Sequence, residues 1–133
     1  MLRYMLDTDI CIYVLKYRPP VVRDAFNRHS EHLCTSTVAL AELFYGAERS
    51  ARPDSNRDTI EAFAARLEVV PFDDRAAAHY GRIRADLESE GRPIGPYGLM
   101  LAAHARSLGL VLVTNNEREF RRVPGLLVEN WAE

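Results

Sequence analysis

Acidic side chains in this sequence occur where several of them could bind one metal ion. Asp7 follows a short apolar run, Glu42 lies in the middle of an apolar stretch, and the polar cluster Thr114–Glu119 follows the apolar run Leu110–Val113. Carboxylates that gather at one place repel one another, so their usual purpose is to hold a hard divalent cation such as Mg²⁺ or Mn²⁺. Such a cation can activate water and stabilise negative charge on a phosphoryl group. The pattern therefore indicates metal-assisted chemistry at a phosphate.

The first acid follows a predicted strand directly and precedes a predicted helix, in which Ile10, Tyr13 and Val14 are the apolar positions. A strand that ends in an acid places that acid at the carboxyl edge of the sheet, where ligands bind in open α/β folds. Asp is also a favoured helix N-cap, so capping by Asp7 or Asp9 explains the same residues without a metal. Both interpretations stay open at this point.

The second acid lies inside a predicted helix, Val38–Glu48, that is apolar on nearly every side. This pattern predicts a buried helix. Burying the carboxylate of Glu42 is costly unless a cation or hydrogen-bond donors compensate it. The alternative is a partly exposed Glu42 that pairs with an arginine.

A glycine breaks the pattern of the helix predicted over Leu99–Ser107. Pro96 suits the first turn that leads into this helix, because its missing N–H costs nothing there. Gly98 does not suit it, since glycine inside a helix costs roughly 1 kcal/mol relative to alanine and an acid would gain from the helix dipole. The sequence shows no structural compensation for Gly98.

The other elements alternate along the chain. Further strands are predicted at His32–Thr35, Glu68–Pro71, Leu110–Val113 and Leu126–Val128, and further helices after Pro20 to about Asn27, at Asp58–Leu67 and from Asp74 to about Glu90, with Ser50–Asn56 as a polar connection. This order predicts one doubly wound α/β domain over residues 1–133, with a central parallel sheet flanked by helices on both faces.

Composition narrows the class of protein. The chain of 133 residues is 47% apolar and 27% charged, as expected of a globular domain. Its net charge of -2 gives no overall positive field, although local patches can still hold phosphates. Cys11 and Cys34 lie in apolar runs and are predicted to be reduced core residues. Asp7 and Asp9 interrupt any signal peptide and no stretch is long and apolar enough for a membrane span, so we expect a cytoplasmic protein.

The motifs, taken in order, resemble those of VapC-type PIN-domain ribonuclease toxins from type II toxin–antitoxin systems. The resemblance covers essentially the whole chain and rests on four segments: Met5–Asp9, Ala41–Ala47, Ile94–Tyr97, and Val113–Asn116 with Arg118–Phe120. It implies a PIN fold and Mg²⁺-dependent (or Mn²⁺-dependent) cleavage of RNA.

The resemblance assigns roles position by position. Asp7 and Glu42 match the first two acids of the family's metal site, and Glu119 matches the late acid. Thr114 resembles the hydroxyl residue that often orients the first acid. Two neighbours complete the comparison: Glu117 is a further acid close to the late position, and Asn116 stands where many PIN domains carry an acid.

Gly98 departs from the family pattern. In the family, the helix after Gly-Pro-Tyr begins with an Asp that is a metal ligand, so this chain lacks one carboxylate. We therefore hypothesise that it is an inactivated or severely weakened ribonuclease. The alternative is a natural variant in which Glu117 or Glu119 supplies the missing ligand.

The resemblance also implies partners. These are a second copy of the chain in a homodimer, a VapB-type antitoxin that covers the acidic site, and a tRNA-type RNA substrate, in enteric relatives the initiator tRNA. Operator DNA is expected to be bound only through the antitoxin, and no membrane is involved. Tyr97 and Arg118 lie beside the proposed site and could contact RNA, with packing and a solvated charge as the simpler roles.

Two other functions compete with this one. The chain could be a binding module that occupies RNA or antitoxin without cutting, which Gly98 favours. It could also be a phosphatase of the haloacid dehalogenase type, because Asp7-Thr8-Asp9 reproduces that class's Asp-x-Asp. The second alternative requires a Thr where Cys11 stands and a late Lys, whereas Lys16 is the only lysine.

Overall fold

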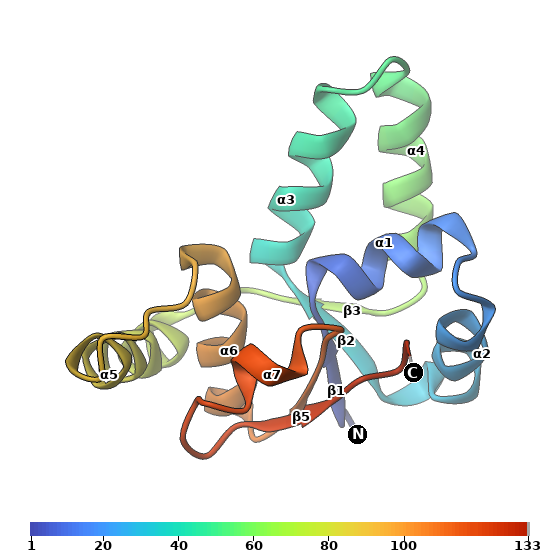
Figure 1. Cartoon of the computed structure of the whole chain (residues 1–133). Coiled ribbons are helices and arrows are strands. Elements are labelled where there is room, and N and C mark those ends of the chain that lie inside the picture. The colour runs from blue at the N-terminus through green and yellow to red at the C-terminus, as the bar shows by residue number, and fades with distance from the viewer. Residues whose placement is uncertain (133) are drawn as a thin grey trace.

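A five-stranded parallel sheet forms the centre of the molecule (Figure 1). The computed structural model describes residues 1–132. The strands lie in the order β3-β2-β1-β4-β5, and neighbouring strands are parallel throughout. Their bounds are β1 (Tyr4–Leu6), β2 (Leu33–Ser36), β3 (Glu68–Val70), β4 (Val111–Val113) and β5 (Leu127–Glu129). The predicted α/β class with a central parallel sheet is confirmed.

Helices cover both faces of this sheet, as parallel strands require. In β1, Tyr4 and Leu6 face a core shared with α1, α2 and α4, whereas Met5 faces a second core shared with α5 and α6. The helices are α1 (Thr8–Lys16), α2 (Pro20–Arg28), α3 (Thr37–Glu48), α4 (Pro53–Ala64), α5 (Asp74–Ser89), α6 (Pro96–Leu108) and α7 (Glu117–Phe120), with a short 3-10 helix at Ser30–His32.

The strand order reverses between β1 and β4. From β1 the chain builds β2 and β3 on one side, and it later adds β4 and β5 on the other. In open α/β sheets, such a switch point leaves a crevice at the carboxyl ends of the two central strands. Asp7 follows β1 directly and Thr114 follows β4 directly, so both lie at this crevice.

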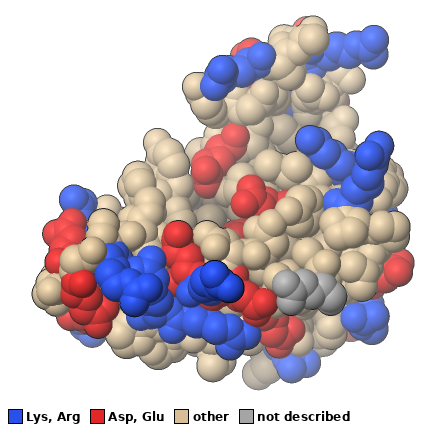
Figure 2. All heavy atoms as spheres, viewed as in Figure 1, with Lys and Arg blue, Asp and Glu red and all other residues tan. Residues whose placement is uncertain are grey.

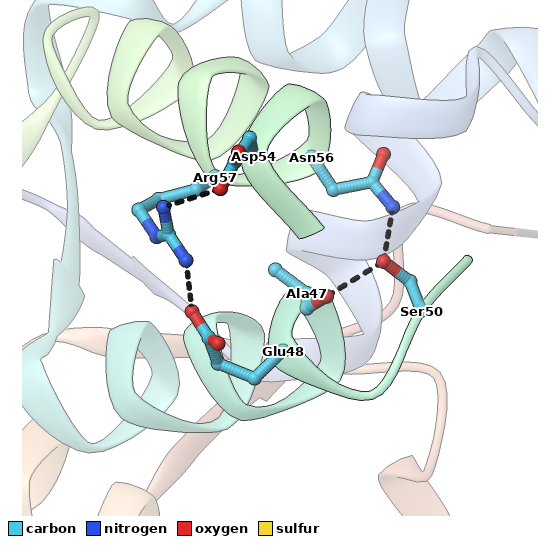
Figure 3. Close-up of polar contacts among 6 residues, drawn as sticks. All are labelled: Ala47, Glu48, Ser50, Asp54, Asn56 and Arg57. Atoms are coloured by element: carbon cyan, nitrogen blue, oxygen red, sulfur yellow. Dashed lines mark hydrogen bonds and ion pairs between the residues drawn. The ribbon is translucent and has the colours of Figure 1, made fainter. Parts of the chain in front are cut away.

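Helices α3 and α4 stand beyond the sheet as a hairpin-like arm (Figure 1). Figure 3 shows the polar contacts at its tip, where Arg57 of α4 forms ion pairs with Glu48 of α3 and with Asp54. Helix α4 begins at Pro53, which occupies the favoured first helical position. The predicted start of this helix at Asp58 was therefore wrong, because part of the expected polar connection is its first turn.

The prediction that α3 is buried all round was also wrong. Only Ala39, Leu43 and Ala47 of this helix are buried, and Tyr45 is 63% exposed. The physical reason is the arm itself. Helix α3 packs against α1 and α4 on one side and projects away from the sheet, so its other side is not covered along its whole length. An apolar face of α3 therefore remains at the surface.

Smaller features complete the comparison with the sequence. Helix α7 was not predicted, because a single turn inside a polar cluster carries no periodic signal. Cys11 and Cys34 are buried and unpaired, as predicted. Within residues 1–132, no helix combines the length and the apolar character that a membrane span requires.

Candidate active site

Asp7 caps helix α1 and also faces the crevice at the switch point. The Ile10 N–H donates to Asp7 Oδ1 over 2.9 Å, and the Asp7 N–H donates to the carbonyl oxygen of Val113 over 3.0 Å. Only 6% of Asp7 is exposed. The capping role is thus present, and it fixes the carboxylate at the carboxyl ends of β1 and β4.

Burial raises the pKa of Asp7 to about 6. Hydrogen bonds from the Thr114 hydroxyl and the Ile10 N–H counteract this rise, while the neighbouring carboxylates of Asp9 and Glu42 add to it. Removing a carboxylate from water disfavours its charged form, so the surroundings of Asp7 favour any cation that compensates the charge. The contact with Thr114 fits the orienting role predicted for that hydroxyl.

Glu42 of α3 reaches the same crevice and is held by Thr8. The Thr8 hydroxyl donates to Glu42 Oε1 over 2.6 Å, across a sequence separation of 34 residues. Glu42 is half-buried, as the alternative expected. Within residues 1–132 it forms no ion pair, so the expected arginine partner was wrong. In the sequence, Thr8 is recognisable only as a hydroxyl next to an acid, because its partner depends on how α1 packs against α3.

The loop after β4 brings the late acidic residues to the crevice. The Asn116 N–H donates to Thr114 Oγ1 over 3.0 Å, and this turn starts α7. Glu119 then lines a cavity of about 170 Å³, whereas Glu117 pairs with Arg121 over 2.9 Å. The lining of this cavity contains the predicted site residues from four separate segments: Asp7, Thr8, Asp9, Glu42, Gly95, Gly98, Leu101, Asn116, Glu119 and Phe120.

Gly98 lies in the first turn of α6, as predicted, and its missing side chain makes room for a neighbour. A Cβ atom at this position would lie 3.0 Å from Cζ of Phe120. Phe120 is 4% exposed and forms part of the cavity wall. The aromatic ring therefore packs against the bare backbone, a structural compensation that the sequence does not reveal.

The acids converge on one cavity without meeting at one point. Asp7, Glu42 and Glu119 all line it. Among the described residues, no three His, Cys, Asp or Glu side chains are grouped closely enough to hold a metal ion. The side chains have the chemistry that a hard cation prefers. Figure 2 shows acidic side chains gathered in the middle of this face.

The sequence was compared with known proteins and families. The model of the PIN domain matches residues 4–126. The chain is 52% identical to the "tRNA(fMet)-specific endonuclease VapC" of Shigella flexneri, over 99% of this chain and 100% of that relative. It is 49% identical to "Ribonuclease VapC2" of Haemophilus influenzae over the same shares. The chain belongs to the VapC-type PIN-domain ribonucleases.

Solved VapC-type structures share the fold as well. The DNA-bound VapBC complex of Salmonella typhimurium contains a chain with a TM-score of 0.94 and 50% identity, covering 98% of this chain and 99% of that one. A chain of VapBC2 of Rickettsia felis, bound to a promoter DNA fragment, has a TM-score of 0.91 and 35% identity, and the match covers 98% of this chain and 99% of that one. This VapC membership confirms the predicted family and rules out the haloacid dehalogenase alternative.

Proposed function

We propose that this chain is the toxin of a VapBC pair and that its cavity is the remnant of a Mg²⁺-dependent (or Mn²⁺-dependent) site for cutting tRNA, impaired by Gly98. The observation that carries the proposal is the convergence of Asp7, Glu42 and Glu119 around one cavity that also includes Gly98. Relatives about half identical to the chain are named as tRNA(fMet)-specific endonucleases, which supports initiator tRNA as the substrate.

The residues that would hold the metal are Asp7, Glu42 and Glu119. When bound, the cation would activate a water molecule and stabilise charge on the scissile phosphate. The chain itself orients the carboxylates: the Ile10 N–H and the Thr114 hydroxyl hold Asp7, and the Thr8 hydroxyl holds Glu42. Without a carboxylate at position 98, we expect this set to bind its metal weakly.

Restoring the acid tests the impairment. We expect Gly98→Asp to cut total tRNA in Mg²⁺ far faster than the original chain. Removing a side chain that hydrogen-bonds to a metal ligand typically lowers metal affinity or activity by about 10- to 100-fold. Restoring a direct ligand should therefore raise the rate of tRNA cleavage by about 100-fold or more. Gly98→Asn is the matched control, because it adds nearly the same volume without a charge. Equal activity of the original chain and Gly98→Asp would show that the site is not impaired.

A second function is binding without cleavage, and Gly98 favours it for the present chain. In this form the protein would occupy tRNA or capture its VapB-type antitoxin and leave RNA intact. Calorimetry with Mn²⁺ separates the two functions, because it measures metal binding without an RNA substrate. We expect weak or undetectable binding by the original chain and clear binding by Gly98→Asp, and tight binding by both would favour the active enzyme.

The partners follow from the same relatives. Solved relatives named VapBC are complexes, two of them with DNA. We propose that a VapB-type antitoxin covers this cavity, that operator DNA is reached only through the antitoxin, and that the toxin is a cytoplasmic homodimer.

A further inference from the structure

The acidic cavity creates an electrostatic problem for the proposed substrate. Asp7, Asp9, Glu42 and Glu119 line it, and each ionised carboxylate repels the phosphates of RNA. The net charge of -2 for the whole chain provides no compensating field. An RNA strand that passes the cavity therefore needs cationic side chains close beside it.

Figure 2 shows a group of basic side chains immediately beside the central acids, over the region where Figure 1 places α7. Helix α7 contributes to the cavity through Glu119 and Phe120. The residue before them, Arg118, is exposed. The helical turn continues to Arg122, whose N–H donates to the carbonyl oxygen of Glu119 over 3.3 Å. Arg118 and Arg122 are thus one helical turn apart.

A third arginine belongs to the same surface. The guanidinium of Arg122 donates through Nη1 to the carbonyl oxygen of Arg92 over 2.7 Å, which joins the end of α7 to the loop before α6. Arg92 is itself exposed. The sequence separation between the two arginines is 30 residues, so the fold and not the local sequence brings them together.

These arginines carry charge that the protein does not neutralise. Within residues 1–132, none of Arg92, Arg118 and Arg122 forms an ion pair with a carboxylate, whereas the adjacent Arg121 pairs with Glu117. Like charges four residues apart on a helix, such as Arg118 and Arg122, destabilise a protein slightly. The two arginines therefore add no stability to the folded chain unless an anionic partner binds them. Guanidinium groups match phosphate oxygens in a bidentate manner.

We propose that Arg92, Arg118 and Arg122 form a surface that binds backbone phosphates of the RNA substrate next to the acidic cavity. The proposal rests on the proposed function, because it takes RNA as the substrate. It adds the residues that bring the strand to the cavity. Such contacts position the strand and carry no base specificity.

Binding of fluorescently labelled total tRNA in EDTA tests the surface without cleavage. We expect Arg118→Ala to weaken binding by about 5- to 10-fold at low salt and to reduce the slope of log K against log salt by about one. Arg118→Glu should weaken it further. Arg118 is the clean position, because its side chain forms no hydrogen bond or ion pair within residues 1–132 whose loss could disturb folding. Arg122→Ala should act in the same direction.

The matched control is Arg28→Ala, which removes one exposed charge from α2, on the other side of the sheet. An unchanged tRNA affinity and salt slope in Arg118→Ala, or an equal loss in Arg28→Ala, would overturn the proposal. A duplex DNA of similar length is the second probe. Because backbone phosphates are common to RNA and DNA, we expect Arg118→Ala to lower the salt slope for this DNA as well, and an unchanged slope would show that Arg118 does not contact phosphates.

The same variants separate this proposal from the proposed function. In a Gly98→Asp background, we expect Arg118→Ala to raise KM for tRNA cleavage with little change in kcat. If Gly98→Asp cuts tRNA and the added Arg118→Ala changes neither tRNA binding nor cleavage, the proposed arginine surface is wrong and the proposed catalytic function stands. If Gly98→Asp cuts nothing and Arg118→Ala still loses tRNA, the catalytic function fails and the surface stands.

Discussion

At the scale of single residues, the buried carboxyl of Asp7 works against the stability of the fold. Its pKa is raised from 3.8 to about 6, mainly by burial. The folded state therefore binds the Asp7 proton more tightly than the unfolded state does. The stability that this proton contributes is complete below about pH 4 and is lost as the pH rises through about 6. At neutral pH the ionised form therefore costs about 3 kcal/mol in free energy of unfolding, from about 1.36 kcal/mol per pH unit.

We therefore expect Asp7→Asn to stabilise the protein in metal-free buffer. The amide oxygen can still accept the Ile10 N–H, and no charge is buried. The gain should be about 1–3 kcal/mol at pH 8 and close to zero at pH 4, because Asp7 is then protonated. Urea unfolding at both pH values measures it. A loss of stability at pH 8 would show that the ionised carboxylate is compensated better than its surroundings indicate.

Thr8 gives a second prediction at this scale. Its hydroxyl holds one oxygen of Glu42 at 2.6 Å. In a Gly98→Asp background, we expect Thr8→Val to weaken Mn²⁺ binding by about 10- to 100-fold, the usual range for the partner of a metal ligand. Thr8→Ser keeps the hydroxyl and should retain most of the affinity. Calorimetry measures both, and equal binding by Thr8→Val and Thr8→Ser would exclude an orienting role.

At the scale of elements, the start of α3 depends on Ser36 and His104. The Val38 N–H donates to Ser36 Oγ over 3.0 Å, and Ser36 Oγ also lies 2.9 Å from Nδ1 of His104. His104 is 1% exposed, and its Nε2 has no hydrogen-bond partner within residues 1–132. Ser36 is thus the cap of α3 and the hydrogen-bond partner of a buried ring.

Ser36→Ala should therefore lower the free energy of unfolding by more than the loss of an ordinary helix N-cap does. Loss of a cap costs about 1 kcal/mol, and an unpaired buried ring nitrogen adds about 1–3 kcal/mol. We expect a total loss of about 2–4 kcal/mol in the free energy of unfolding, measured by urea unfolding. The control is Ser89→Ala, since the Ser89 hydroxyl donates to the exposed carbonyl oxygen of Asp86, and the loss of stability should stay within about 0.5 kcal/mol. Equal effects would show that His104 does not depend on Ser36.

The elements also explain which features the sequence could predict. The carboxyl-edge position of Asp7 followed from a strand and a helix that are adjacent in the chain, so local pattern was sufficient. The contact between Thr8 and Glu42 spans 34 residues and depends on how two helices pack, which no local pattern encodes. Gly98 was recognised as unusual, but its compensation by Phe120 required α7, whose single turn has no periodicity.

At the scale of the whole molecule, an apolar hollow beside the acidic cavity remains uncovered. Its volume is about 770 Å³, and its lining includes Val38, Tyr45, Tyr97 and Met100. Tyr45 is 63% exposed and Tyr97 is 58% exposed. Exposed apolar patches of this kind are typical of protein interfaces. The homodimer proposed from the family resemblance would cover such a face.

We accordingly expect the chain to sediment at twice its mass of 15.1 kDa, and Tyr45→Glu or Tyr97→Glu to shift it toward the monomer. A charge buried in an apolar interface without a partner is strongly unfavourable, so micromolar concentrations should reveal the change. Tyr17→Glu is the matched control, because Tyr17 is 62% exposed and lies between α1 and α2. A dimer that survives both substitutions would mean that the hollow faces another partner, and a loss of VapB binding in the same variants would assign it to the antitoxin.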